Sequence, residues 1–203
     1  MIGGDLYSGF GTSTLEERRI RLLENLDVLG MMGGKYVISG SILSHPDLTL
    51  RREERVSEYG IPLYLYEYMK ARPVFYIATT TIAHPHSSFS ALVDAQVSFN
   101  NVTFLDCITC SSRAQEAATI KLVERGNGSY RFHVSTNTER YVVLSESFLP
   151  GWHAWIDGNP VSIIRANGLY MAILVPTGEH SITFEYQGLF DELKILRRIG
   201  IVE

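Results

Sequence analysis

Two short motifs contain residue types that catalyse reactions or bind metals, but neither motif is complete. Cys107 and Cys110 form a C-x-x-C pair, and His84 and His86 flank a proline. A structural zinc site uses about four ligands, and no second ligand pair stands at a suitable spacing from either motif. The sequence also has no nucleophile elbow, zinc-protease helix motif or phosphate-binding loop. It therefore predicts no catalytic residue, no metal site and no cofactor, and the chain is not expected to catalyse a reaction by itself.

The interpretation of the cysteine pair depends on the local backbone. In an extended strand, residues three positions apart are separated by about 10 Å, beyond the roughly 7 Å that a disulfide spans, so a bridge requires a turn. A thioredoxin-like motif would begin a helix after a strand, whereas the sequence after Cys110 becomes strand-like. Incidental thiols, a local disulfide, and a redox or metal-binding pair all remain open.

The segment 147–160 contains both tryptophans of the chain, between turn signals at Pro150-Gly151 and Asp157-Gly158. Alternate side chains share one face of a strand. Trp152 shares its face with apolar residues, which predicts a core position, whereas Trp155 shares its face with a histidine and an aspartate, which predicts exposure. Exposed aromatic rings can stack on the apolar faces of sugars. The predicted ligand-binding residues are Trp155, His153, Asp157 and Arg165.

The elements expected to position these residues fall into two regions and a tail. Region 1–85 predicts a small α/β segment with a helix over about 13–29, which Ser13 and Glu16 would begin as a capping box. The strands expected there cover about 35–39, 62–68 and 74–79. The charged run 51–55 predicts a solvated loop or a helical turn.

Region 86–190 predicts an antiparallel β-sandwich or jelly roll, because short β-rich runs alternate with Gly, Pro and Asn turn signals. The expected strands cover 97–104, 119–124, 130–134, 141–145, 153–156, 161–165, 170–175 and 180–186. Residues 191–203 predict a closing helical tail. The predicted fold class is therefore mainly β, and α+β overall.

The composition of the 203 residues is that of an ordinary globular protein, with 45% hydrophobic and 20% charged residues. The net charge of −4 argues against nucleic-acid binding, which favours basic surfaces. No apolar run approaches the roughly 18–20 residues that span a bilayer, and the first residues lack the charged and apolar regions of a signal peptide. The chain itself is expected to be soluble.

Three blocks of the C-terminal region together resemble one protein family. They are the P-G-W and D-G elements within 141–158, the R-A-N element within 164–170, and the V-P-x-G-x-H element within 175–186. In this order they resemble the C-terminal region of YfhO-type bacterial membrane proteins and related GT-C-like glycosyltransferases. The segments 29–39 and 65–75 show a looser similarity. The sequence departs from the family at Leu149, where tyrosine is usual, and at 69–71, where an Asn-rich turn is usual.

The resemblance implies a polytopic membrane protein that transfers a sugar from a polyprenyl-phosphate donor on the outer face of the membrane. The catalytic acid of such proteins lies between early membrane helices and has no counterpart here. The chain would then be an extracytoplasmic, non-catalytic accessory domain whose partners are the transmembrane part of its parent protein and a glycan or lipid-linked sugar. Two alternatives are a structural β-domain without a ligand and a free-standing carbohydrate-active enzyme.

Overall fold

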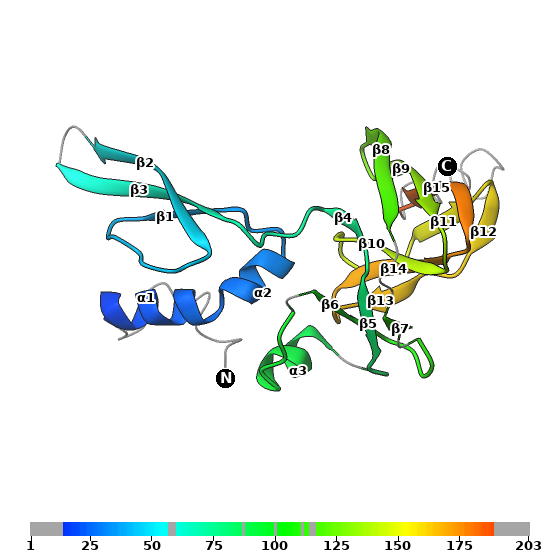
Figure 1. The fold of residues 1–203 in the computed structure, drawn as a ribbon, viewed down its shortest axis with the longest axis horizontal. Coiled ribbons are helices and arrows are strands. Elements are labelled where there is room, and N and C mark those ends of the chain that lie inside the picture. The colour runs from blue at the N-terminus through cyan, green and yellow to red at the C-terminus, as the bar shows by residue number, and fades with distance from the viewer. Residues whose placement is uncertain are drawn as a thin grey trace, which may run out of the picture. The chain divides into compact units, whose positions relative to one another are not determined.

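The computed structural model describes residues 14–56, 60–86, 88–99, 101–110, 112–113 and 117–188. Of these residues, 48% are in strands and 13% in helices, which confirms the predicted mainly β fold class. The chain divides into two compact units (Figure 1). The first comprises Met1–Val74 and Ser90–Asn100, and the second comprises Phe75–Phe89 and Asn101–Glu203.

The first unit is a three-stranded antiparallel sheet with helices packed against one face. Its sheet has the strand order β1-β3-β2. Its core combines Leu26 with inward-facing residues of the sheet, among them Tyr64, Tyr66 and Tyr68, which alternate along one strand and therefore share a face. The elements are α1 (Leu15–Glu24), α2 (Leu26–Met31), β1 (Tyr36–Ser39), β2 (Leu48–Val56) and β3 (Ile61–Tyr68), and α3 (Phe89–Asp94) follows later in the chain.

The predicted N-terminal helix is present as two consecutive helices, and its cap lies one residue later than expected. Thr14 caps α1, since its hydroxyl accepts a hydrogen bond from the Glu17 amide and the Glu17 carboxylate accepts one from the Thr14 amide. The break falls at Asn25, whose side-chain amide donates to the carbonyl of Arg21 at 2.7 Å. Such bonding of an asparagine side chain to the backbone competes with the helical pattern. Ser13, the expected cap, lies outside the described residues.

The prediction of a loop or helical turn over 51–55 is wrong, because this run forms part of β2. Its residues pair with β3 in antiparallel register, with an irregularity between Leu50 and Arg52. The side chains of 51–55 are exposed, and β2 is at the edge of its sheet. Charged residues are common on edge strands, where they oppose association with other strands. A charged run therefore does not by itself indicate a loop.

The second unit contains two sheets. A seven-stranded sheet has the order β4-β10-β14-β13-β6-β5-β7, and a five-stranded antiparallel sheet has the order β12-β11-β15-β9-β8. The strands of the unit are β4 (Phe75–Ile77), β5 (Thr80–Ala83), β6 (Val102–Leu105), β7 (Ser112–Arg113), β8 (Ala118–Gly126), β9 (Ser129–Thr136), β10 (Arg140–Leu144), β11 (Trp152–Ile156), β12 (Asn159–Val161), β13 (Ile164–Ala166), β14 (Tyr170–Val175) and β15 (Gly178–Tyr186).

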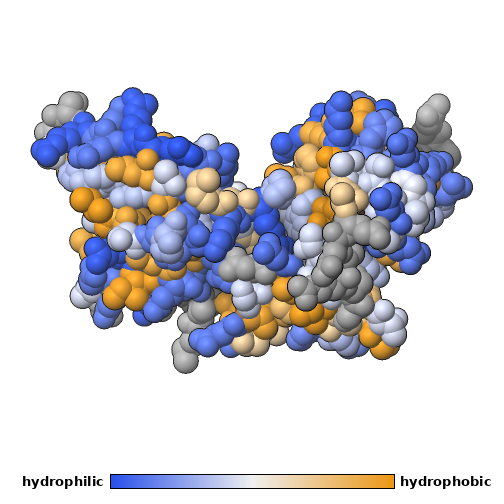
Figure 2. All heavy atoms as spheres, viewed as in Figure 1, coloured by the Kyte–Doolittle hydropathy of each residue, from blue (hydrophilic) through white to orange (hydrophobic). Residues whose placement is uncertain are grey.

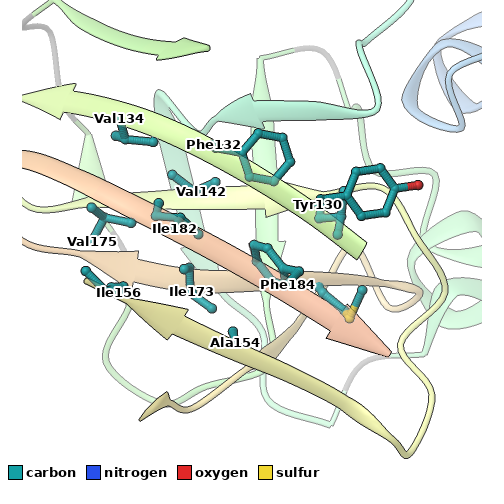
Figure 3. Close-up of a cluster of buried hydrophobic side chains, with 12 residues drawn as sticks. Tyr130, Phe132, Val134, Val142, Ala154, Ile156, Ile173, Val175, Ile182 and Phe184 are labelled. Atoms are coloured by element: carbon teal, nitrogen blue, oxygen red, sulfur yellow. The ribbon is translucent and has the colours of Figure 1, made fainter. Parts of the chain in front are cut away.

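The two sheets of the second unit share one apolar core, which makes this unit sandwich-like. Figure 3 shows side chains of β9, β11 and β15 together with side chains of β10 and β14 in this cluster. Phe132 and Phe184 are completely buried in it, and their rings lie 6.3 Å apart in an edge-to-face arrangement. Burying a side chain of this size contributes about 1.5–3 kcal/mol. Apolar patches lie among hydrophilic ones on the surface of both units (Figure 2).

The boundary between the units differs from the predicted boundary at residue 85. The expected strand over 74–79 is β4, which pairs with β10 in the second unit, and residues 90–100 belong to the first unit. The expected strand over 161–165 is two strands, β12 and β13, which belong to different sheets. The β5–β6 pair is parallel, not antiparallel, because the long connection through α3 separates these strands. The predicted tail over 191–203 lies outside the described residues.

Candidate functional site

An open groove of about 400 Å³ lies in the second unit beside the first residues of β11. Its walls come from three stretches of chain: residues 148–151, residues 152–155, and the group Pro160, Val161 and Ile163. Ligand pockets in proteins commonly enclose about 300–1,000 Å³. The groove is therefore large enough for a small ligand such as one sugar ring, and most of its walls are aromatic or aliphatic.

The groove exists because β12 is shorter than β11. The last pair between them joins Ala154 with Val161, after which the chain leaves this sheet for β13 of the other one. Gly151 turns the chain into β11 with a φ of +101°. Its carbonyl accepts a hydrogen bond from the Gln187 amide at 2.7 Å, and a Cβ at this position would lie 2.6 Å from the Gln187 carbonyl oxygen. Glycine is therefore required where the P-G-W element begins the strand.

Trp152 belongs both to the core and to the groove. Its half-buried ring packs against the core cluster, and the ring centroids of Tyr186 and Tyr130 lie 5.4 and 6.4 Å away. The predicted core position is therefore correct for part of the side chain. The hydrogen bonds at Gly151 and Asp157 are directed toward β15, and main-chain groups of successive residues in an antiparallel strand alternate in direction. The amide and carbonyl of Trp152 consequently point to the side of β11 on which the groove lies.

Trp155 and His153 lie on the opposite face of β11 and also line the groove. Their ring centroids are 5.9 Å apart. His153 is exposed, but Trp155 is half-buried and not fully exposed as predicted. The reason is its position between two strands, where it faces Thr183 of β15 and Pro160 of β12.

Arg165 stands behind one wall of the groove and does not line it. It belongs to β13 of the other sheet, and its guanidinium lies 5.1 Å from the ring centroid of Phe148, which does line the groove. Its carbonyl oxygen accepts a hydrogen bond from the Asp106 amide at 2.9 Å. Arg165 therefore supports the position of Phe148.

Asp157, the fourth predicted ligand-binding residue, is not among the residues that line the groove. It begins the two-residue turn between β11 and β12, where Asp157 and Gly158 have φ values of +52° and +81°. Two positive φ values are typical of a tight hairpin turn. One carboxylate oxygen lies 2.7 Å from His180 Nδ1, and the other accepts a hydrogen bond from the Ser181 amide at 2.8 Å. The carboxylate is thus used within the fold.

His180 is a structurally important residue that the sequence analysis did not single out. Its Nδ1 faces Asp157, and its Nε2 lies 3.3 Å from the carbonyl oxygen of Thr177. Both ring nitrogens face an acceptor, which favours the doubly protonated imidazolium. The hydrogen bond to Asp157 accordingly raises the pKa of His180, and the hydrogen bond from His180 lowers the pKa of Asp157. Asp157 belongs to the D-G element and His180 to the V-P-x-G-x-H element, so the presence of both elements was the sequence feature that could have indicated this contact.

The R-A-N element likewise has a structural role. Asn167 is completely buried. Its side-chain oxygen accepts a hydrogen bond from the main-chain amide of Phe104 at 2.9 Å, and its main-chain amide donates to the Phe104 carbonyl at 2.7 Å. Its side-chain nitrogen lies 3.3 Å from the Tyr76 hydroxyl. At the next residue, a Cβ on Gly168 would lie 2.2 Å from the amide nitrogen of Phe89. These residues join β13 to β6 and β4.

The histidine and cysteine motifs follow neighbouring parallel strands, β5 and β6, and lie close together. The His84 amide donates to the Leu105 carbonyl, and the His86 amide donates to the Asp106 carboxylate at 2.6 Å. Cys107 and Cys110 are joined by a disulfide across a bend, with their Cα atoms 6.0 Å apart. Of the interpretations left open, the local disulfide is the one that the structure shows. Within the described residues, no group of three or more potential ligands is arranged to hold a metal ion.

Comparison of the chain with protein-family models, with curated proteins and with solved structures found no match. In the described part of the chain, no helix combines the length and apolarity needed to cross a bilayer. The chemistry of the groove follows from its own walls. Among the described residues that line it, His153 is the one with a titratable side chain, and there is no carboxylate. The described walls of the groove are thus mainly aromatic and aliphatic, with one imidazole among them.

Proposed function

We propose that the chain is a non-catalytic accessory domain that holds a sugar ring of a glycan in the groove beside β11. Its setting would be the extracytoplasmic part of a membrane glycosyltransferase-like protein that uses a polyprenyl-phosphate-linked sugar. The observation that carries the proposal is the groove itself, in which Phe148, Trp152 and Trp155 provide aromatic surface within about 400 Å³.

A sugar ring has the surface that such a groove accommodates. Its C–H faces are apolar and pack on aromatic rings, whereas its hydroxyl groups need hydrogen-bond partners. The main-chain amide and carbonyl of Trp152 are directed to this side of the strand, and the imidazole of His153 adds a donor and an acceptor. The described residues of the lining include no carboxylate and no lysine or arginine, which favours a neutral sugar.

Two further observations support the extracytoplasmic setting. The Cys107–Cys110 disulfide is typical of proteins that fold in an oxidising compartment. The three sequence blocks that resemble YfhO-type proteins occur in the family order within 141–186. In this setting the partners of the domain are the transmembrane part of the parent protein and the glycan or lipid-linked sugar that the parent uses.

A structural β-domain without a ligand is the second candidate, and a specific observation favours it. The residues of the three family-like blocks stabilise turns and strand junctions. Asp157 is hydrogen-bonded to His180, Asn167 to Phe104, and Gly151 to Gln187. A likeness based on such residues follows from the fold, whether or not the groove is used.

Titration with neutral oligosaccharides distinguishes the two candidates. The chain contains two tryptophans, and both line the groove, so their indole N–H signals in an NMR spectrum report on it directly. Carbohydrate binding predicts that both signals shift with saturation, together with transfer of magnetisation from protein to sugar. A purely structural domain predicts that neither signal shifts with any oligosaccharide or lipid-linked sugar.

A further inference from the structure

The loop that follows β6 carries a disulfide that is unequally exposed to solvent. Cys110 is buried, with 8% of its surface exposed, whereas Cys107 is half-buried. Between them Ile108 is 84% exposed, and Thr109 is exposed as well. A reagent that approaches from solvent therefore meets the Cys107 side of the bridge first.

The fold holds Cys110 in place independently of the bridge. Its carbonyl oxygen accepts a hydrogen bond of 2.6 Å from the hydroxyl of Thr81 on β5, in a buried position. Neither cysteine is among the residues of the sandwich core cluster around Phe132 and Phe184. The bridge joins residues only three positions apart, and a disulfide that closes so short a loop restricts the unfolded chain far less than one that closes a long loop. Opening the bridge would thus leave the sandwich and the position of Cys110 largely intact.

We infer that Cys107–Cys110 is a thiol–disulfide exchange site, and that its partner is a protein dithiol. In the first step a partner thiolate attacks the sulfur of Cys107. A mixed disulfide forms, the bond to Cys110 breaks, and Cys110 leaves as a thiolate that takes up a proton. In the second step the partner's other thiolate attacks its own sulfur of the mixed disulfide and releases Cys107, which is protonated. The partner loses two electrons and becomes a disulfide, and this chain gains them as two thiols.

Ile108 provides the contact that a protein partner requires. A large apolar side chain exposed to this degree contributes nothing to the core, but it lies between the two cysteines at the surface. A dithiol protein with an apolar strip beside its reactive cysteine can cover it. The partner class is therefore a folded dithiol protein of the thioredoxin type, and a small thiol would react without using this contact. The site is separate from the groove beside β11 and does not depend on the proposed carbohydrate function.

Reduction of the full chain in native buffer tests the inference. Reduced thioredoxin and dithiothreitol serve as the protein and small-molecule reductants, and alkylation followed by mass spectrometry counts the free thiols. The expected result is complete reduction by both reagents without denaturant, with an unchanged near-UV circular dichroism spectrum. Substituting Ile108→Ser is expected to slow reduction by thioredoxin about tenfold, from the lost apolar contact, and to leave the rate with dithiothreitol unchanged.

Trapping with single-cysteine variants identifies the attacked sulfur. With the remaining cysteine of each variant first activated as a mixed disulfide with thionitrobenzoate, a thioredoxin variant that lacks its second cysteine should displace thionitrobenzoate and form a stable mixed disulfide with Cys110→Ser, which presents Cys107, at least about tenfold faster than with Cys107→Ser. The double variant Cys107→Ser/Cys110→Ser serves as the control for folding. A bridge that opens only in denaturant would overturn the inference. So would equal trapping by both single-cysteine variants, or an Ile108→Ser rate with thioredoxin equal to that of the wild type.

Discussion

Asp157 and His180 meet at the tip of the β11–β12 hairpin, where a carboxylate oxygen of Asp157 lies 2.7 Å from Nδ1 of His180. The two residues belong to separate sequence blocks, D-G and V-P-x-G-x-H, and both blocks contribute to the resemblance to YfhO-type proteins. The fold therefore brings the two blocks into one contact, which anchors the hairpin that forms one wall of the groove. Asp157 acts on the groove through the hairpin that it stabilises.

The Asp157–His180 pair predicts a stability that depends on pH. The hydrogen bond with His180 lowers the pKa of Asp157 below its ordinary value of 3.8. The stabilisation that Asp157 gives the folded chain is therefore present above pH 3.8 and is lost as the pH falls through the lower folded-state pKa. The pKa of His180 is raised by its hydrogen bond with Asp157, so its contribution is present below 6.5 and is lost as the pH rises through the higher folded-state pKa.

Thermal unfolding of the wild type and Asp157→Asn across this range measures the effect. The melting temperature of the wild type should exceed that of the variant most between pH 3.8 and 6.5. The difference in melting temperature should shrink below and above this range. His133→Asn, which alters an exposed histidine of β9, serves as the control for loss of an imidazole elsewhere on the surface. A difference between wild type and Asp157→Asn that stays constant with pH would contradict the pairing.

Gly151 and Gly158 provide a matched pair of glycine substitutions. Both have positive φ, but a Cβ at Gly151 would lie 2.6 Å from the Gln187 carbonyl oxygen, whereas a Cβ at Gly158 would have no atom within 4 Å. Gly158→Ala is expected to lower the free energy of unfolding by about 1–2 kcal/mol from backbone strain alone. Gly151→Ala adds a steric clash with the Gln187 carbonyl oxygen and is expected to lower the free energy of unfolding by about 3 kcal/mol. Urea denaturation of both variants makes the comparison, and equal losses would show that Gln187 does not approach Gly151 in this way.

Asn167 is predicted to be essential for the junction of β13, β6 and β4. Asn167→Ala removes the buried hydrogen bond from the Phe104 amide to the Asn167 side-chain oxygen, at a cost of about 2–3 kcal/mol. Asn159→Ala changes an exposed asparagine of β12 and should cost little. Both free energies can be measured by urea denaturation. If Asn167→Ala proved as stable as Asn159→Ala, the hydrogen bonds of Asn167 would not support the sheet.

Local patterns predicted most strands and turns of the second unit, because they depend on neighbouring residues. A β-rich run after a turn signal predicted β15, and the Asp157-Gly158 pair predicted the hairpin turn, with positive φ at both positions. The sheet to which a strand belongs depends on distant residues. Local patterns therefore place β4 in the wrong region, join β12 and β13 into one strand, and miss β2 because its charges are typical of a loop.

The candidate site shows the same limit at the level of single residues. Strand periodicity placed Trp152 and Trp155 correctly on opposite faces of β11. It did not reveal that both line one groove, because the groove arises where β12 ends, and that end is set by pairing between strands. Asp157 and Arg165 looked equivalent to His153 as polar neighbours of an aromatic strand. In the folded chain the carboxylate of Asp157 is hydrogen-bonded to His180, and the guanidinium of Arg165 packs on the ring of Phe148 without lining the groove.

The two tryptophans are predicted to differ in what their removal changes. Trp152→Ala removes a ring that packs on the core and is expected to lower the free energy of unfolding by about 3 kcal/mol. Trp155→Ala, on the opposite face of the strand, is expected to cost about 1 kcal/mol. Circular dichroism follows unfolding in both variants without relying on tryptophan emission. Equal losses would contradict the assignment of Trp152 to the core.

The central claim is that the groove beside β11 binds a sugar ring, and calorimetric titration of wild type and Trp155→Ala with the oligosaccharide that shifts the indole signals tests it most directly. Tyr36→Ala, which removes an aromatic ring that is 57% exposed in the first unit, is the matched control. The account predicts binding by the wild type and Tyr36→Ala with equal affinity, and affinity about tenfold weaker in Trp155→Ala from loss of the stacking surface. Equal affinities in all three proteins would contradict it.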